Sequence, residues 1–160
     1  MLKTFLVNKY KNRCKVKDES GIRNNDSQTI LLIEDNADIL ENLTEFLEIE
    51  GYKVLAANNG ERGIELAAEF IPDLIICDVL MREMDGYEVL HLLLDTTNTH
   101  DIPFIFSTSM SEKVDREEAL KLGAADYIVK PFELHALLKM VKACLQARAK
   151  EKKVITTLFT

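Results

Sequence analysis

The sequence predicts an α/β domain built on a doubly wound, five-stranded parallel sheet. Short apolar runs alternate five times with segments of helical periodicity between residues 29 and 150. The segments 29–33 (TILLI) and 74–77 (LIIC) are continuously apolar or nearly so, which is typical of strands buried on both faces. At 160 residues the chain is too short for two ordinary domains. Right-handed crossovers then place helices on both faces of one sheet.

The elements are expected in strict alternation along the chain. Strands are predicted at 29–33, 52–57, 73–77, 103–106 and 126–129. Helices are predicted at 38–50, 60–70, 86–95, 112–122 and from 133 to about 150, each with apolar residues three and four positions apart. Gly51 and Gly123 are expected to end the first and fourth helices, because glycine readily adopts the left-handed conformation that follows a helix.

Charge divides the chain into an acidic body and a basic head. Residues 1–28 hold seven basic and three acidic side chains, a net charge of +4. The whole chain has a net charge of −7, so residues 29–160 have a net charge of −11. We interpret 1–28 as a flexible basic extension, 29–148 as the domain, and 149–160 as a tail or linker. The acidic body argues against direct nucleic-acid binding, which needs Lys and Arg to neutralise phosphates.

Cysteine usage and hydropathy indicate a cytoplasmic location. Cys14, Cys77 and Cys144 are odd in number and lack metal-ligand spacing, so a disulfide framework is not expected. The apolar stretch near the N-terminus is too short for a signal peptide. No run approaches the roughly 18 apolar residues of a membrane span.

Polar residues gather where the predicted strands end. Glu34 and Asp35 follow the first strand, Asp78 the third, Thr108 the fourth, and Lys130 the fifth. Ligands of open α/β sheets bind at the carboxyl ends of the strands, near the point where the strand order reverses. Each residue alone is weak evidence for function, but their shared position at four strand ends predicts a common site.

Such a set suits phosphoryl acceptance. Bare carboxylates at Glu34, Asp35 and Asp78 would repel one another, and Mg²⁺ relieves this because it prefers oxygen ligands. A carboxylate beside Mg²⁺ is a competent nucleophile toward phosphorus. Lys130 is the candidate ammonium for the phosphoryl oxygens in the transition state, and the Thr108 hydroxyl is a candidate hydrogen-bond donor afterwards.

Four segments carry a resemblance to a known family. They are 32–36 (LIEDN), 77–86 (CDVLMREMDG), 103–109 (PFIFSTS) and 123–132 (GAADYIVKPF). In their order and spacing they resemble the response-regulator receiver domains of two-component signalling, within the CheY-like superfamily, over about residues 29–148. The resemblance implies a flavodoxin-like fold with strand order 2-1-3-4-5 and five helices.

The resemblance also implies a role for each matched residue. Asp78 matches the phosphoacceptor, Glu34 and Asp35 the acidic pair that holds Mg²⁺, and Lys130 the phosphoryl-binding lysine. Asp78 and the backbone carbonyl of Leu80 would be further metal ligands. The hydroxyl of Thr108 and the aromatic ring of Tyr127 match the two switch residues of the family. The resemblance also implies a cis peptide between Lys130 and Pro131. Tyr127 is also compatible with a plain core or rim aromatic.

The sequence departs from the family pattern at a few positions around the site. Arg82 stands where proline is usual, and Ser109 replaces the usual alanine beside Thr108. Leu80 and Met110 occupy variable positions that tune dephosphorylation in relatives. None of these changes removes a catalytic group.

The implied partners are a sensor histidine kinase or phosphotransfer protein and a downstream output domain or protein. The resemblance also implies an interaction face made by the fourth helix, fifth strand and fifth helix, for a partner or a homodimer. The domain would be no enzyme beyond catalysing its own phosphorylation and dephosphorylation. The sequence leaves open whether the chain is a stand-alone regulator or part of a larger one.

Three rival functions are weaker. A pseudo-receiver that docks without phosphorylation should have lost Asp78, Asp35 or Lys130, and all three are present. A phosphatase with an Asp nucleophile needs a second Asp where Leu80 stands. A flavin carrier needs a phosphate-cradling loop after the first strand, where Glu34 and Asp35 would repel the phosphate.

Overall fold

The sheet has the predicted strands and the predicted order. The computed structural model describes residues 28–109 and 116–158. Its strands are β1 (Thr29–Ile33), β2 (Lys53–Ala57), β3 (Leu74–Asp78), β4 (Phe104–Ser109) and β5 (Asp126–Lys130). All four neighbouring pairs are parallel, and the strand order is β2-β1-β3-β4-β5. The order reverses between β1 and β3, which is where a ligand site is expected.

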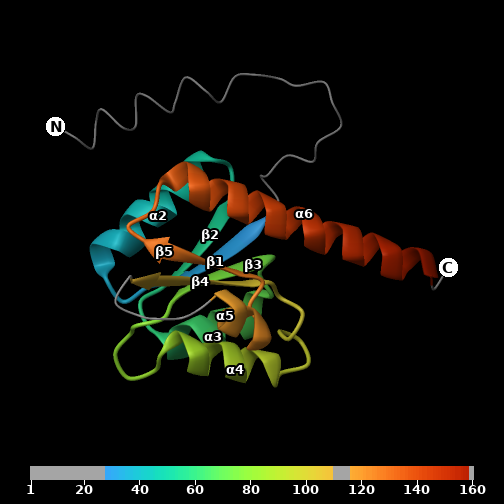
Figure 1. Ribbon diagram of the computed structural model, residues 1–160, viewed down its shortest axis with the longest axis horizontal. Helices are drawn as coiled ribbons and strands as arrows, with labels where there is room; N and C mark the ends of the chain where they lie inside the picture. The colour runs from blue at the N-terminus through green and yellow to red at the C-terminus, as the bar shows by residue number, and fades with distance from the viewer. Residues whose placement is uncertain (1–27, 110–115, 159–160) are drawn as a thin grey trace.

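Helices cover both faces of this sheet, as Figure 1 shows. One face carries α2 (Ala37–Ile49) and α6 (Leu134–Leu158), and the other carries α3 (Gly60–Phe70), α4 (Gly86–Leu94) and α5 (Arg116–Lys121). We call these the α2/α6 face and the α3/α4/α5 face. The five helices within the described residues confirm the doubly wound flavodoxin-like fold. None of these helices is long and apolar enough to span a bilayer.

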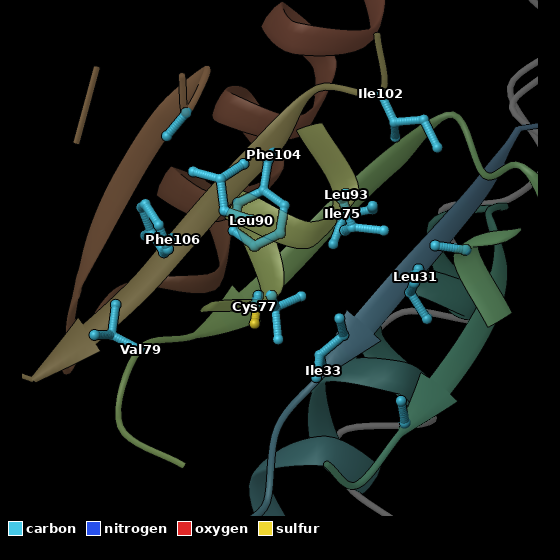
Figure 2. Close-up of a cluster of buried hydrophobic side chains, with 14 of the residues drawn as sticks. Leu31, Ile33, Ile75, Cys77, Val79, Leu90, Leu93, Ile102, Phe104 and Phe106 are labelled. Carbon is cyan, nitrogen blue, oxygen red and sulfur yellow. The ribbon is translucent and has the colours of Figure 1, made fainter. Parts of the chain in front are cut away.

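Strand alternation divides the core between the two faces. Phe104 and Phe106 of β4 pack with Leu90 and Leu93 of α4 on the α3/α4/α5 face (Figure 2). Ile105, between the two phenylalanines, belongs to the separate cluster on the α2/α6 face. Successive residues of a strand point to opposite faces, so the parity of each position decides which layer its side chain joins.

The same parity sorts the ends of the strands. On β3, Leu74 and Ile76 belong to the α2/α6 face, whereas Cys77 is fully buried in the cluster of the α3/α4/α5 face (Figure 2). Cys77 is therefore a core residue, in agreement with the buried apolar run 74–77 that the sequence shows. Asp78, one residue later, falls on the α2/α6 side.

Local sequence shapes the loop between β3 and α4. A Cβ atom placed on Gly86 would lie 2.5 Å from the backbone carbonyl oxygen of Asp78, so only glycine fits this approach. Asp85 caps α4 in a reciprocal capping box with Glu88. The Gly86 amide also donates to the Val79 carbonyl at 2.9 Å. The loop is thus fastened directly to the end of β3.

Two elements extend further than the sequence pattern predicted. Strand β4 continues through Ser107 and Thr108 to Ser109, since its ladder with β5 persists to the pair Ser109–Lys130. Helix α6 continues to Leu158, and not to about Lys150, because no Gly or Pro interrupts residues 150–158. The assignment of 149–160 as tail or linker stays a prediction. The expected start of the fourth helix, at 112, lies outside the described residues.

Arg148 of α6 attaches this helix to the segment that leads into β3. Its Nη1 donates to the carbonyl oxygens of Pro72 and Asp73, at 2.9 and 2.7 Å, just before β3. Burial lowers the pKa of this guanidinium, and the charges of Asp73 and Asp101 partly offset the effect.

Candidate functional site

The three predicted acidic residues meet at the carboxyl edge of the sheet. Glu34 and Asp35 directly follow β1, and Asp78 is the last residue of β3. One carboxylate oxygen from each lies within 4.8 Å of the other two, an arrangement able to hold a metal ion. Glu34 and Asp78 are buried, and Asp35 is partly exposed. We call these three residues the acidic centre.

Lys130 bridges two members of the acidic centre. Its Nζ lies 2.6 Å from Oε2 of Glu34 and 3.2 Å from Oδ1 of Asp78. Because β4 separates β5 from β3, the lysine side chain must cross the end of β4 to reach these oxygens. The predicted meeting of Lys130 with the carboxylates at one edge is therefore observed.

The crowding of charge shifts the ionisation of both partners. Burial and the neighbouring charge of Glu34 raise the pKa of Asp78 to about 6, against the opposing effects of Lys130. Burial alone would lower the pKa of Lys130, but its hydrogen bond to Glu34 and the charge of Asp78 outweigh burial and raise it. One ammonium thus compensates the acidic centre incompletely, which favours an added cation.

Asp35 and Glu34 are also held by backbone groups. The amide of Arg82 donates to Oδ2 of Asp35 at 3.3 Å, and Nε of Arg82 lies 3.8 Å from the same oxygen. Proline, which the resemblance leads one to expect at this position, has no amide hydrogen and could not make this contact. The amide of Asn36 donates to Oε1 of Glu34 at 3.1 Å, while its side chain caps α2.

The two predicted switch residues lie on the neighbouring strands. Thr108 is buried at the end of β4, and its hydroxyl donates to the Ser109 carbonyl at 3.3 Å. Tyr127 of β5 is partly buried and packs against the cluster of the α3/α4/α5 face. Their switch roles stay predictions.

The remaining predicted features are placed as follows. The Lys130–Pro131 peptide is cis, which confirms that prediction. Leu80 lies in the loop after β3 with its side chain exposed, and the metal-ligand role of its carbonyl stays a prediction. Met110 lies outside the described residues.

Sequence reasoning missed some of the features that surround the acidic centre. It did not anticipate the packing of Gly86 on the Asp78 carbonyl or the contact of Arg82 with Asp35. It also grouped Ser107 with the residues following the strand, whereas Ser107 is buried within β4, in register with Asp78. Strand parity would have placed Ser107 beside Asp78, had β4 been predicted at its full length.

The fold and site together define a small doubly wound α/β domain with a carboxylate–lysine centre at its topological switch point. The chain belongs to the response regulator receiver domain family, whose family model matches residues 30–142. It is accordingly a receiver domain of the two-component type.

Relatives from several bacteria share the domain. Transcriptional regulatory protein CpxR of Escherichia coli K12 is 37% identical over 117 residues, which are 73% of this chain and 49% of CpxR. Protein PilH of Pseudomonas aeruginosa is 34% identical over 116 residues, which are 72% of this chain and 96% of PilH. The chain spans about half the length of CpxR and of several other curated relatives.

Solved structures show the same fold. The receiver domain of a signal transduction histidine kinase from Syntrophus aciditrophicus has a TM-score of 0.69 at 36% identity, covering 76% of this chain and 92% of that one. Chemotaxis protein CheY4 of Vibrio cholerae has a TM-score of 0.68 at 26% identity, covering 73% and 98% of the two chains.

Proposed function

We propose that this receiver domain accepts a phosphoryl group on Asp78 from a sensor histidine kinase or phosphotransfer protein. The observation that carries the proposal is the position of Asp78 between Lys130 and two further carboxylates at the switch point of the sheet. A buried carboxylate that faces a lysine and an acidic pair has a nucleophilic oxygen with positive charge at hand.

A divalent cation, Mg²⁺ by its preference for oxygen, fits the acidic centre. Three carboxylates with one shared ammonium retain a negative excess, and burial together with the charge of Glu34 raises the pKa of Asp78 to about 6. Glu34, Asp35 and Asp78 would hold the ion, together with the carbonyl of Leu80. When bound, Mg²⁺ would neutralise charge that develops on the transferring phosphoryl oxygens.

The chain's own residues perform the remaining chemistry. A carboxylate oxygen of Asp78 forms a bond to phosphorus as the bond from phosphorus to the donor's histidine nitrogen breaks. The electron pair of that bond stays on the nitrogen, which takes up a proton. Lys130 supplies its ammonium to a phosphoryl oxygen, and the Thr108 hydroxyl donates to another. The domain is otherwise no enzyme, since its product is its own modified side chain.

The output of the modification is a population shift. Contacts of the phosphoryl group with Thr108 and Lys130 favour one of two conformations of the domain. Tyr127 follows Thr108 and changes the surface made by α5, β5 and α6. That surface meets a downstream output domain or protein, or a second copy of the chain. The function is carried out in the cytoplasm, where histidine kinases present their phosphohistidine.

Intact-mass spectrometry tests the proposal. The purified protein is incubated with Mg²⁺ and acetyl phosphate, and the expected result is a gain of one phosphoryl group that Asp78→Asn abolishes. The same reaction with chelator in place of Mg²⁺ should give no gain. Failure of the wild-type protein to gain mass from any small donor or histidine kinase would instead favour a docking module that works without phosphorylation.

A further inference from the structure

Ser107 is a buried hydroxyl with no hydrogen-bond partner. The residue is 3% exposed, and its Oγ is among the buried side-chain atoms of the described residues that lack any partner. An unsatisfied buried hydroxyl is costly, because folding removes its water without replacing the hydrogen bond. A hydrogen-bond partner for this hydroxyl would therefore contribute to stabilising any state of the domain that supplies one.

Strand register places Ser107 beside the acidic centre. Its Cα is paired with that of Asp78 across the β3–β4 ladder, and with that of Ile128 across the β4–β5 ladder. Ile105, two residues earlier on β4, and Ile128 both belong to the cluster of the α2/α6 face. By parity, the side chains of Ser107, Asp78 and Lys130 share that side of the sheet.

The side chain of Lys130 crosses β4, the strand that contains Ser107. It extends from β5 over the end of β4, and its ammonium contacts Asp78 and Glu34. The ammonium of Lys130 has three N–H donors, and in the metal-free state the carboxylates of Glu34 and Asp78 accept from it. Both carboxylates are also members of the acidic centre that the proposed cation would occupy.

We propose that Ser107 is a positioning residue for Lys130, whose ammonium donates to the Ser107 hydroxyl once the oxygens of Glu34 and Asp78 turn to a divalent cation. The inference rests on the proposed function. The hydroxyl that is orphaned in the metal-free state becomes an acceptor in the metal-bound state, so it favours cation binding. It also keeps Lys130 over the end of β4, within reach of a phosphoryl group on Asp78.

The test measures Mg²⁺ affinity and thermal stability of the full chain by calorimetry, for the wild type and Ser107→Ala. Without metal, Ser107→Ala is expected to melt at the same temperature as the wild type or above it, because the orphaned hydroxyl is gone. With metal, the dissociation constant for Mg²⁺ should rise about five-fold, which corresponds to about 1 kcal/mol. A substitution that merely disturbed packing would instead lower the melting temperature in both states.

Thr44→Val is the matched control. The Thr44 Oγ1 is likewise buried without a partner, but it lies on α2, about 12 Å along the helix axis from Asn36. Thr44→Val should leave the Mg²⁺ dissociation constant unchanged. Equal Mg²⁺ affinity of Ser107→Ala and wild type, or an equal change in Thr44→Val, overturns the role of Ser107 and leaves the proposed function standing. A wild-type protein that binds no Mg²⁺ overturns the proposed function first, and this inference with it.

Discussion

Glu34 and Lys130, 96 positions apart in the chain, lie with Oε2 and Nζ 2.6 Å from each other. Their contact joins the end of β1 to the end of β5, and β3 and β4 lie between these two strands in the sheet. Asp78 lies between them in the strand order and shares the same ammonium at 3.2 Å. Lys130 therefore supplies positive charge to both buried carboxylates of the acidic centre in the absence of a metal ion.

Lys130→Met should destabilise the metal-free protein by about 3–5 kcal/mol at neutral pH, because two buried carboxylates lose their compensating charge. Chemical denaturation measures the loss. Saturating Mg²⁺ should reduce it, since the cation supplies positive charge to the same carboxylates. Lys139→Met, on the exposed side of α6, is the control and should have little effect. A loss equal to that of the control would contradict the role assigned to Lys130.

Asp78→Asn should make the metal-free protein more stable above about pH 6. The folded-state pKa of Asp78 is raised to about 6 from its ordinary 3.8, so the folded state binds the proton more tightly than the unfolded state. The free energy of unfolding therefore falls as pH rises from about 4 to about 6, and this group alone contributes a loss of about 3 kcal/mol. Asp78→Asn removes the dependence.

Denaturation curves at about pH 4 and about pH 7.5 check this expectation for the wild type and Asp78→Asn. The wild type should lose more stability between the two values than the variant does. A variant that is less stable than the wild type at the higher pH would show that the Asp78 carboxylate is stabilising, contrary to its raised pKa.

Gly86→Ala should lower both stability and the rate of phosphorylation. The added Cβ would lie 2.5 Å from the Asp78 carbonyl oxygen, and relief of that clash must move the loop after β3. A stability loss of about 1–3 kcal/mol is expected for such overpacking. At Gly60 an added Cβ meets side-chain atoms of Met84 and Val89, so Gly60→Ala should slow phosphorylation less. Equal rates in the two variants would argue against a special role for the Gly86 contact.

Arg148→Met should destabilise the protein by about 1.5–3 kcal/mol, because two backbone carbonyls before β3 lose a charged hydrogen-bond donor. Urea denaturation measures this, and Arg62→Met is the control. Arg62 pairs only at the surface with Glu65, where an ion pair contributes little. If both substitutions cost the same, the attachment of α6 by Arg148 would be of no consequence.

The sequence predicted the sheet because apolar runs and helical periods alternate without interruption. It located Glu34, Asp35, Asp78 and Lys130 at one edge because carboxyl ends of parallel strands meet there. Contacts that depend on three-dimensional detail were not predictable in the same way. The spacing of residues 82 and 35 in the chain says nothing of the 3.3 Å contact between the Arg82 amide and Asp35.

Element boundaries were the weaker part of the prediction. The apolar pattern of the fourth strand stops at Phe106, but strand pairing with β5 keeps residues 107–109 within the ladder. The apolar pattern therefore does not reveal the burial of Ser107 beside Asp78. Helix α6 continues past its expected end at about residue 150. The lysines in this part of the chain are good helix formers, even where they make no contact with the core.

The central claim is tested most directly by locating the phosphoryl group in the chain. After reaction with Mg²⁺ and acetyl phosphate, borohydride reduces an aspartyl phosphate to homoserine, which peptide mass spectrometry assigns to one position. We predict homoserine at position 78 of the wild type, and unmodified asparagine there in Asp78→Asn. Homoserine at another position, or a phosphorylated protein that yields none, would contradict the assignment of Asp78 as the phosphoryl acceptor.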